Sequence, residues 1–346
     1  MKEIISQFLL YLRMKNVYII GVVVLYFFLS ALGVQAREQN IALVIRPCFF
    51  GEMEFASRIV RAGENIGWKS TILDYQDKTI EDEKYDFVLS LVPEAYPSSH
   101  ATYLALFDPK NHYFKNDGQL KFEYKIYDGY LVTYPIDYSE KSVPFFSFRP
   151  WIDWFPLVQF LEYKEVDPTH LFYVCCSWGS RAKDEKYKTF LKLLDQSSYA
   201  YFYGRSSFES FYPNSYKGPI PVDGESILTE IHNAGICLVL HSSNHLESAI
   251  PSGRIFEAIA SSAVVISDKN PFVEANFGDA VFYVDQNSNG EDLFKQVEAH
   301  VNWIRTHKEE SIAMAKKAYE IYREKFLLED QLIRLEKWHD KITLED

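Results

Sequence analysis

Cysteine is scarce in this sequence: Cys48, Cys175, Cys176 and Cys237 are the four in 346 residues. Four cysteines are too few for a disulfide-stapled scaffold of this length. Cys175 and Cys176 are adjacent in an apolar run, where the side chains of a strand point to opposite faces and do not hold one zinc ion together. We therefore expect these cysteines to be small buried hydrophobic side chains.

Positive charge is also in deficit. Lys and Arg number 36 against 48 Asp and Glu, so the formal net charge is -12. A general nucleic-acid-binding protein usually presents a basic surface, and this composition argues against one. An anionic small ligand remains compatible with the sequence if basic residues gather locally.

Several catalytic and phosphate-binding motifs are missing. The sequence contains no Gly-x-Gly, no Gly-Lys-Ser/Thr, no Gly-x-Ser-x-Gly and no Asp-x-Asp. These absences exclude the dinucleotide fingerprint, the phosphate loop, the nucleophile elbow and a common metal signature of nucleotide-sugar transferases. His241 and His245 are four residues apart, but no Glu follows His241, so no zinc site is predicted and we place both histidines at the mouth of a cleft or in a loop after a strand.

The amino terminus carries the chain's long apolar run. Residues 17–34 contain no charge, and Lys2, Arg13 and Lys15 precede them. This pattern predicts an uncleaved single-pass membrane helix with its amino end in the cytoplasm and the globular part across the membrane. The alternative is a signal peptide cleaved at the small residues that follow, which would export the protein.

Strands and helices alternate along the rest of the chain, which is long enough for two domains. In the first half we expect a helix over residues 54–66 and strands over residues 41–46, 70–73, 87–92 and 130–134. In the second half we expect strands over residues 171–176, 199–203, 236–240, 264–267 and 280–284. The helices between and after them are expected over residues 186–194, 225–233, 252–260, 291–305, 309–327 and 329–341. Such alternation predicts α/β domains built on parallel sheets with helices on both faces.

The most informative stretch follows the strand at residues 236–240. Ser252 and Gly253 begin a helix that carries Arg254 and Glu257. Free N–H groups and the helix dipole make a helix amino terminus at the carboxyl end of a parallel strand a site for anions. An arginine adds a bidentate donor for the same phosphate, and a carboxylate one turn later can accept hydrogen bonds from ribose hydroxyls. The spacing therefore predicts a nucleoside diphosphate across the strand ends.

Residues 171–338 resemble the donor-binding half of group 1 glycosyltransferases with two Rossmann-like domains, the GT-B architecture. The shared pattern is Pro-x-x-Arg-x-x-Glu-Ala, then small residues, an apolar strand and Ser-Asp, here starting at Pro251 and ending at Asp268. Exostosin-like transferases are a second choice, because their Ser-Asp is followed by Pro-Phe, here Pro271 and Phe272 with one residue fewer in the gap.

The resemblance implies a domain plan. Residues 1–37 are the signal peptide or anchor, residues 38–160 an acceptor-side α/β domain, residues 161–325 a nucleotide-sugar-binding α/β domain, and residues 326–346 a carboxyl-terminal helix. The two Rossmann-like domains would enclose an interdomain cleft, preceded by the hydrophobic helix.

The resemblance also implies donor contacts. Arg254 would contact the pyrophosphate, Glu257 the ribose, and Ser252 with Gly253 a phosphate, while Pro219 lies where such enzymes seat the nucleobase. The alternative is that Arg254 simply pairs with an acidic neighbour on its helix.

Further donor contacts are assigned to two other segments. One segment, a run of charged residues, contains three candidates for contacts with the diphosphate: Arg181, Lys183 and Lys186. The alternative is that this run is simply the solvated start of a helix. Asn244, His245 and Glu247 are the candidates for the donor sugar.

Two positions depart from the family pattern. Ala249 stands where the first glutamate of a Glu-x7-Glu pair is expected, which puts a retaining mechanism based on that glutamate in doubt. Residues 261–263 replace the usual glycine after the helix.

Catalysis requires a general base near the acceptor hydroxyl. Glu52, Glu54 and His100 follow predicted strands of the first domain and are the candidates, with ordinary surface positions as the alternative.

These features predict a metal-independent glycosyltransferase without a cofactor. It would move a sugar from a nucleotide-sugar donor to a glycan or lipid-linked acceptor. A non-catalytic sugar- or nucleotide-binding protein of the same fold is the alternative, and a nucleotide-sugar epimerase of that architecture is a weaker one.

Overall fold

The structure, a computed structural model, describes residues 38–47, 50–81, 84–93, 98–107, 126–133, 149–174 and 184–345. The predicted hydrophobic helix over residues 17–34 lies outside these ranges. Within them, no helix combines the length and the apolar character needed to cross a membrane. The membrane segment and the localisation therefore stay predictions.

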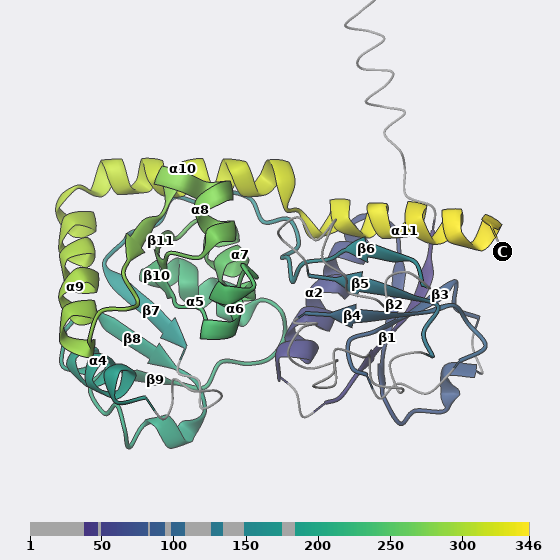
Figure 1. The fold of residues 1–346 in the computed structure, drawn as a ribbon, viewed down its shortest axis with the longest axis horizontal. Helices are drawn as coiled ribbons and strands as arrows, with labels where there is room; N and C mark the ends of the chain where they lie inside the picture. Colours follow the sequence, from purple (N-terminus) through teal and green to yellow (C-terminus); the bar gives the residue numbers. More distant parts are fainter. Residues whose placement is uncertain are drawn as a thin grey trace, which may run out of the picture. The chain divides into compact units, whose positions relative to one another are not determined.

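The first sheet has six strands, all paired in parallel, in the order β2-β1-β3-β4-β5-β6 (Figure 1). Its strands are β1 (Asn40–Ile45), β2 (Lys69–Asp74), β3 (Phe87–Ser90), β4 (Thr102–Leu106), β5 (Gly129–Val132) and β6 (Trp151–Asp153). Helix α2 (Phe50–Asn65) follows β1, and a short 3-10 helix, η1 (Thr79–Glu81), follows β2. Residues 41–45 of β1 are at most 2% exposed, because neighbouring strands and helices cover both faces of a central parallel strand.

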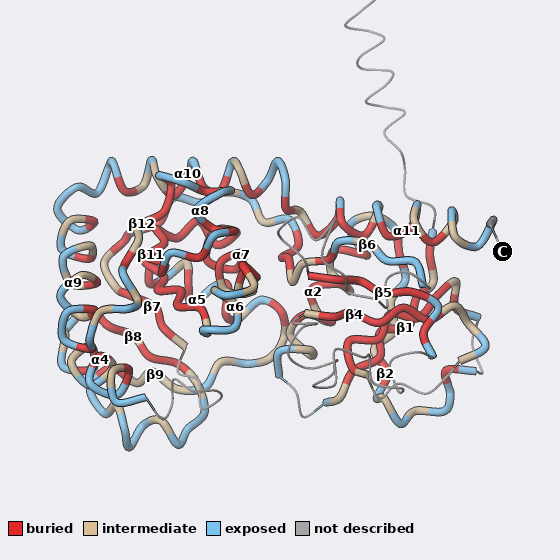
Figure 2. The backbone as a smooth tube through the Cα atoms, in the orientation of Figure 1, coloured by how far each residue is buried: buried red, intermediate tan, exposed pale blue. Residues whose placement is uncertain are grey.

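The second sheet also has six parallel strands, in the order β12-β11-β10-β7-β8-β9. Its strands are β7 (His170–Val174), β8 (Ala200–Tyr203), β9 (Tyr216–Gly218), β10 (Gly235–Val239), β11 (Val264–Asp268) and β12 (Phe282–Val284). Its α-helices are α4 (Glu185–Asp195), α5 (Ser226–Ala234), α6 (Ser243–Glu247), α7 (Gly253–Ala260), α8 (Pro271–Phe277), α9 (Gly290–Thr306) and α10 (Lys308–Lys325). Short 3-10 helices are η5 (Ser206–Phe208) and η6 (Gly278–Ala280). Figure 2 shows the central strands of both sheets as mainly buried.

Each sheet reverses its strand order next to its first strand. β1 lies between β2 and β3, and β7 lies between β8 and β10. Ligands of open parallel sheets bind in the crevice outside the carboxyl ends of the strands at such a reversal. The prediction of two α/β domains with parallel sheets is thus confirmed, and their topology directs attention to the carboxyl ends of β1, β7 and β10.

The chain returns to the first sheet at its carboxyl end through helix α11 (Leu328–Glu345). The Tyr103 hydroxyl of β4 lies 2.7 Å from Nδ1 of His339, and the Gln39 amide donates to Glu336. The linker between β6 and β7 comprises residues 154–169. Beside the start of α11, Val158 of this linker forms a parallel bridge with Leu327. The outgoing and returning segments therefore run next to each other.

Three strands and two helices among the described residues were not predicted from the sequence: β4, β6, β9, α6 and α8. β6 and β9 have three residues each, too few to show a period. β4 lies at the start of a stretch that has no clear pattern of apolar residues. The aromatic, proline-containing stretch at residues 145–156 predicts a loop near a domain boundary, but Trp151–Asp153 within it form β6 and pair in parallel with β5.

Candidate functional site

A cavity of about 990 Å³ opens at the carboxyl ends of strands from both sheets. Residues from the first sheet that line it follow β1, β4 and β5 and are Phe50, Gly51, Glu52, Glu54, Phe55, Arg58, Phe107 and Thr133. From the second sheet, the lining includes residues 204–208 after β8, Leu240 and His245 after β10, and residues 251–254 with Glu257 at the start of α7. Pro219 and the three residues after it also line the cavity. The cavity therefore lies where the strand reversals predict a ligand.

Helix α7 places the residues that are predicted to bind the nucleotide-sugar donor at the wall of this cavity. The Ser252 side chain caps the helix by accepting a hydrogen bond from the Arg254 amide at 3.3 Å. Gly253 lies against Pro156 of the linker. Side chains at positions three apart share one helix face, and Arg254 and Glu257 accordingly form an ion pair beside the cavity. Serine caps of this kind are favoured because their oxygen satisfies an otherwise unpaired amide.

Arg254 does pair with Glu257, as the alternative interpretation of the sequence expected. It also lines the cavity, and its side chain is 23% exposed. A guanidinium has five N–H donors, and one nitrogen serves this pair. The pairing and a role in binding phosphate are therefore compatible.

Glu257 is nearly buried and lies between two arginines. Its Oε1 atom is 2.7 Å from the Arg58 guanidinium of α2, and its Oε2 atom contacts Arg254. Burial alone would raise the pKa of Glu257, but the two positive charges outweigh burial and hold that pKa below its ordinary value. Glu257 is therefore an anion held at the wall of the cavity.

Glu54 is the candidate base with the most distinctive surroundings. It lines the cavity, its side chain is 13% exposed, and its carboxylate lies 3.0 Å from Arg58. Burial raises the pKa of Glu54, and this effect exceeds the opposing influence of Arg58 and of a backbone hydrogen bond from Gly224. A carboxylate whose pKa is raised towards neutrality suits general base catalysis better than an exposed one. Glu52 also lines the cavity, in the first turn of α2.

His100 lies elsewhere, so its selection as a catalytic candidate is not supported by position. It stands two residues before β4, its Nε2 atom is 3.1 Å from the Ile80 carbonyl, and its ring packs on Tyr85. The unexpected strand β4 explains the difference: His100 lies at the amino end of a strand, and the cavity is at the carboxyl ends.

The basic candidates after β7 are only partly described. Arg181 and Lys183 lie outside the described residues. Lys186 is in the first turn of α4, where its ammonium group contacts the Gln286 carbonyl and lies over the Tyr187 ring. Lys186 is not among the residues that line the cavity. Its predicted diphosphate contact is therefore not supported in this conformation.

The three candidates for contacts with the donor sugar all lie on α6, but they differ in whether they line the cavity. His245 lines the cavity, whereas Asn244 and Glu247 are exposed and do not line it. Successive residues of a helix point in different directions, so one short helix does not turn all three side chains to one ligand. Ala249, which follows, is 5% exposed and has a φ of 53°.

The Ser-Asp motif at the carboxyl end of β11 has a structural explanation. Asp268 accepts from the backbone amide of His241 at 2.7 Å and contacts its Nδ1 atom at 2.6 Å. Both side chains are fully buried, so His241 follows β10 as expected but lies inside the domain and not at a cleft mouth. Asn270 caps α8 and donates to the Ile250 carbonyl at 3.0 Å. This network joins the strand ends beneath the loop that leads to α7.

Sequence reasoning missed two arginines at the cavity. Arg58 is 2% exposed, although it lies on a helix recognised from its sequence. Arg205 follows β8 and lies over the Phe50 ring, 5.8 Å from its centroid. The spacing of Glu54 and Arg58, one helical turn apart, indicates an ion pair but does not by itself indicate that Arg58 is buried. Its second partner, Glu257, is far away in the sequence.

Metal ligands do not converge in the part of the chain that the structure describes. No three His, Cys, Asp or Glu side chains there are arranged to hold an ion.

A family model matches part of the chain's second half. Residues 183–337 match the family model described as glycosyl transferase-like. This match includes α7 and most of the second sheet, and it confirms the resemblance to glycosyltransferases and the prediction of an enzyme of that class. A search of curated proteins finds no match to this chain.

Solved structures share the fold at low identity. The sucrose-phosphate synthase of Thermosynechococcus elongatus is similar with a TM-score of 0.54 at 10% identity, over 89% of this chain and 100% of that one. HepE of Anabaena in complex with UDP-glucose has a TM-score of 0.53 at 10% identity, over 86% of this chain and 98% of that one. A glycosyltransferase from Rickettsia africae has a TM-score of 0.50 at 11% identity, over 88% and 99%. These likenesses show the two-domain GT-B fold.

Proposed function

We propose that this chain, whose residues 183–337 form a glycosyl transferase-like domain, transfers a sugar from a nucleotide-sugar donor to a glycan or lipid-linked acceptor without a metal ion. The observation that carries the proposal is the position of Arg254 and Glu257 at the start of α7, on the wall of a large cavity at the strand ends. The UDP-glucose complex of HepE, which has the same fold, supports a nucleotide-sugar as donor.

The donor's diphosphate is assigned to the start of α7. The helix dipole at that turn and the Arg254 guanidinium supply positive potential, and anions are favoured at such a helix end. The same groups would stabilise the nucleoside diphosphate as it departs, which is the task that a metal ion performs in other transferases. The nucleobase is assigned to Pro219 and the neighbouring residues that line the cavity.

Glu54 is proposed as the general base. It takes the proton of the acceptor hydroxyl while that oxygen bonds to the anomeric carbon of the donor sugar. The bond from this carbon to the diphosphate breaks, and the nucleoside diphosphate leaves with the electron pair. This single displacement inverts the anomeric carbon, and it needs no second glutamate at the position occupied by Ala249.

The first experiment measures binding of UDP, GDP, ADP and CMP to the full chain by calorimetry. We expect one nucleotide to bind saturably and Arg254→Ala to weaken it about tenfold or more, since a charge-assisted hydrogen bond to phosphate is lost. Arg305→Ala is the matched control, because Arg305 is exposed on α9 and does not line the cavity.

The outcomes separate the candidate functions. A folded wild-type protein that binds none of the four nucleotides contradicts the donor site. Binding without sugar transfer or donor hydrolysis favours the non-catalytic alternative. Binding with release of nucleotide from the matching nucleotide-sugar supports a transferase.

A further inference from the structure

We propose that Arg58 of helix α2 is a positioning residue of the donor site, which it reaches from the first domain. In this proposal, which rests on the proposed function, Arg58 holds the Glu257 carboxylate in place for the donor's ribose. The recognition of ribose would then depend on contact between a helix of the first domain and a helix of the second.

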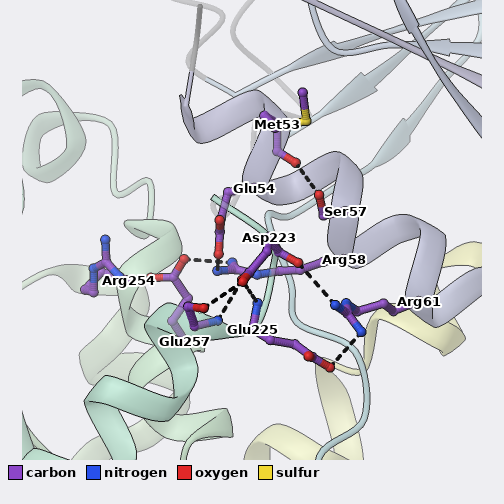
Figure 3. Close-up of polar contacts among 10 residues, drawn as sticks. Met53, Glu54, Ser57, Arg58, Arg61, Asp223, Glu225, Arg254 and Glu257 are labelled. Atoms are coloured by element: carbon purple, nitrogen blue, oxygen red, sulfur yellow. Dashed lines mark hydrogen bonds and ion pairs between the residues drawn. The ribbon is translucent and has the colours of Figure 1, made fainter. Parts of the chain in front are cut away.

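Arg58 is the centre of a chain of alternating charges (Figure 3). Its guanidinium lies 3.0 Å from Glu54 on its own helix and 2.7 Å from Glu257 on α7. Glu257 in turn contacts Arg254. Two negative and two positive groups thus alternate from α2 to the wall of the cavity, and each interior group has an opposite charge on both sides.

The packing around Arg58 fixes its position. Its side chain is 3% exposed, and it has carboxylate partners on two sides. Gly224 of the second domain lies so close that an added Cβ would be 3.3 Å from the Arg58 Cγ atom and 3.1 Å from the Ser57 Cβ atom. A long side chain confined in this way has few rotamers left, so it holds the carboxylate that it contacts.

The remaining hydrogen-bonding capacity of Glu257 matches a ribose. A carboxylate offers about four lone-pair sites on its two oxygens. Arg58 contacts one oxygen and Arg254 the other, which leaves about one site on each for the two vicinal hydroxyls. Because Glu257 lines the cavity, these sites are within reach of a bound nucleotide.

Arg58 and Arg254 have different positions relative to the ligand. Arg254 is 23% exposed on its side chain and faces the region assigned to the phosphates. Arg58 also lines the cavity, but its side chain is 3% exposed and is paired with Glu257. When a diphosphate engages Arg254, Arg58 is the cation that continues to hold Glu257.

Arg61 provides a matched control on the same helix. It forms an ion pair with Glu225 of the second domain at 2.7 Å, but it is 38% exposed on its side chain and lies outside the cavity lining. Replacing Arg61 removes a contact between the same two domains and leaves Glu257 and its partners unchanged.

The test compares ribose with 2′-deoxyribose. UDP, GDP, ADP and CMP and their 2′-deoxy forms are titrated against the full chain by calorimetry. For the nucleotide that binds, we expect wild type and Arg61→Met to prefer the ribose form about 10- to 100-fold, as for hydrogen bonds to a charged group. In Arg58→Met we expect the ratio to fall towards one, with partial recovery in Arg58→Lys.

A second variant guards against misfolding. Arg58→Met leaves two buried carboxylates with one cation, so Arg58→Met with Glu54→Gln removes one charge of each sign and keeps the pair of Glu257 with Arg254. Loss of ribose preference in this folded double variant supports the proposal. An unchanged ratio in either folded variant overturns it and leaves the donor site intact, and the absence of nucleotide binding by wild type overturns the proposed function as well.

Discussion

The Glu54 carboxylate combines burial with a place at the cavity wall. Its neighbours act in opposite directions: burial and the charge of Glu257 raise its pKa, whereas Arg58 and the Gly224 amide lower it. The net result is a carboxylate that remains protonated to a higher pH than an exposed glutamate. Glu54 must be deprotonated to accept a proton, so the activity proposed here should increase as pH rises through this raised pKa.

Glu54→Gln tests this assignment. We expect nucleotide binding to remain and kcat for nucleotide release from the donor to fall about 10²- to 10⁴-fold, the usual contribution of a general base. The acid limb of the kcat/KM profile of wild type should lie at a higher pH than the titration of an exposed glutamate and should vanish in the variant. Glu52→Gln is the comparison, and an acid limb lost in that variant instead would move the role of base to Glu52.

At the residue scale, local sequence patterns predicted one side of the site and missed the other. Ser252, Arg254 and Glu257 share a helix start, and their contacts with one another follow from spacing along that helix. The role of Arg58 depends on Glu257, which belongs to another domain, so no local pattern contains it. His100 lies away from the cavity for a related reason, since its position depends on β4, a strand that local sequence patterns did not predict.

Helix α7 ends in a Schellman motif without glycine. The Ala263 amide donates to the Ala258 carbonyl and the Ser262 amide to the Ile259 carbonyl. Ser262 has a φ of 62°, a left-handed conformation in which glycine is the usual residue. Its hydroxyl compensates in part, because it accepts a hydrogen bond from the Lys164 amide at 3.3 Å.

Two substitutions of Ser262 should therefore differ. Ser262→Gly relieves the left-handed strain and loses a long hydrogen bond, so we expect the free energy of unfolding to change by less than about 1 kcal/mol. Ser262→Val puts a β-branched residue at a positive φ and should reduce that free energy by about 2 kcal/mol or more. Urea denaturation followed by circular dichroism measures both, and equal stability of the two variants would contradict the strain argument.

Longer elements were predictable from periodicity, and short ones were not. The central strands are buried on both faces and form apolar runs, while α9 and α10 repeat apolar residues at helical spacing. The three residues of β6 contain no such repeat, and Trp151 in it is 41% exposed. Its strand conformation comes from pairing with β5, a tertiary effect on a segment of weak local preference.

At the scale of the whole molecule, helix α11 follows the second domain in sequence but packs on the first sheet, so it contributes to the stability of the first domain. Leu328, Leu332 and Leu335 are fully buried, and Trp338 lies so close to Gly129 that an added Cβ there would be 2.6 Å from its ring. Three buried leucines alone contribute about 5–9 kcal/mol of transfer free energy. That amount is comparable to the total stability of a domain.

Ending the chain after Leu327 should therefore unfold the first sheet. We expect the amides of β1 and β3 to lose protection in hydrogen exchange, because their core residues are exposed where α11 packed. A chain that ends after Lys341 is the control, since it lacks only the end of the helix, where Leu344 is 86% exposed. Retained protection in the shorter chain would show that the first sheet is stable without α11.

The segments that enter and leave the second sheet meet at the bridge between Val158 and Leu327. The Leu328 amide donates to the Val158 carbonyl, and the Tyr322 hydroxyl donates to the same carbonyl at 2.7 Å. In topological terms, the second domain is an insertion into the first, with both junctions at one place. The second domain should therefore be exchangeable as a unit. Replacing residues 159–326 with the corresponding domain of another GT-B protein would require only two neighbouring junctions and would leave α11 packed on the first sheet.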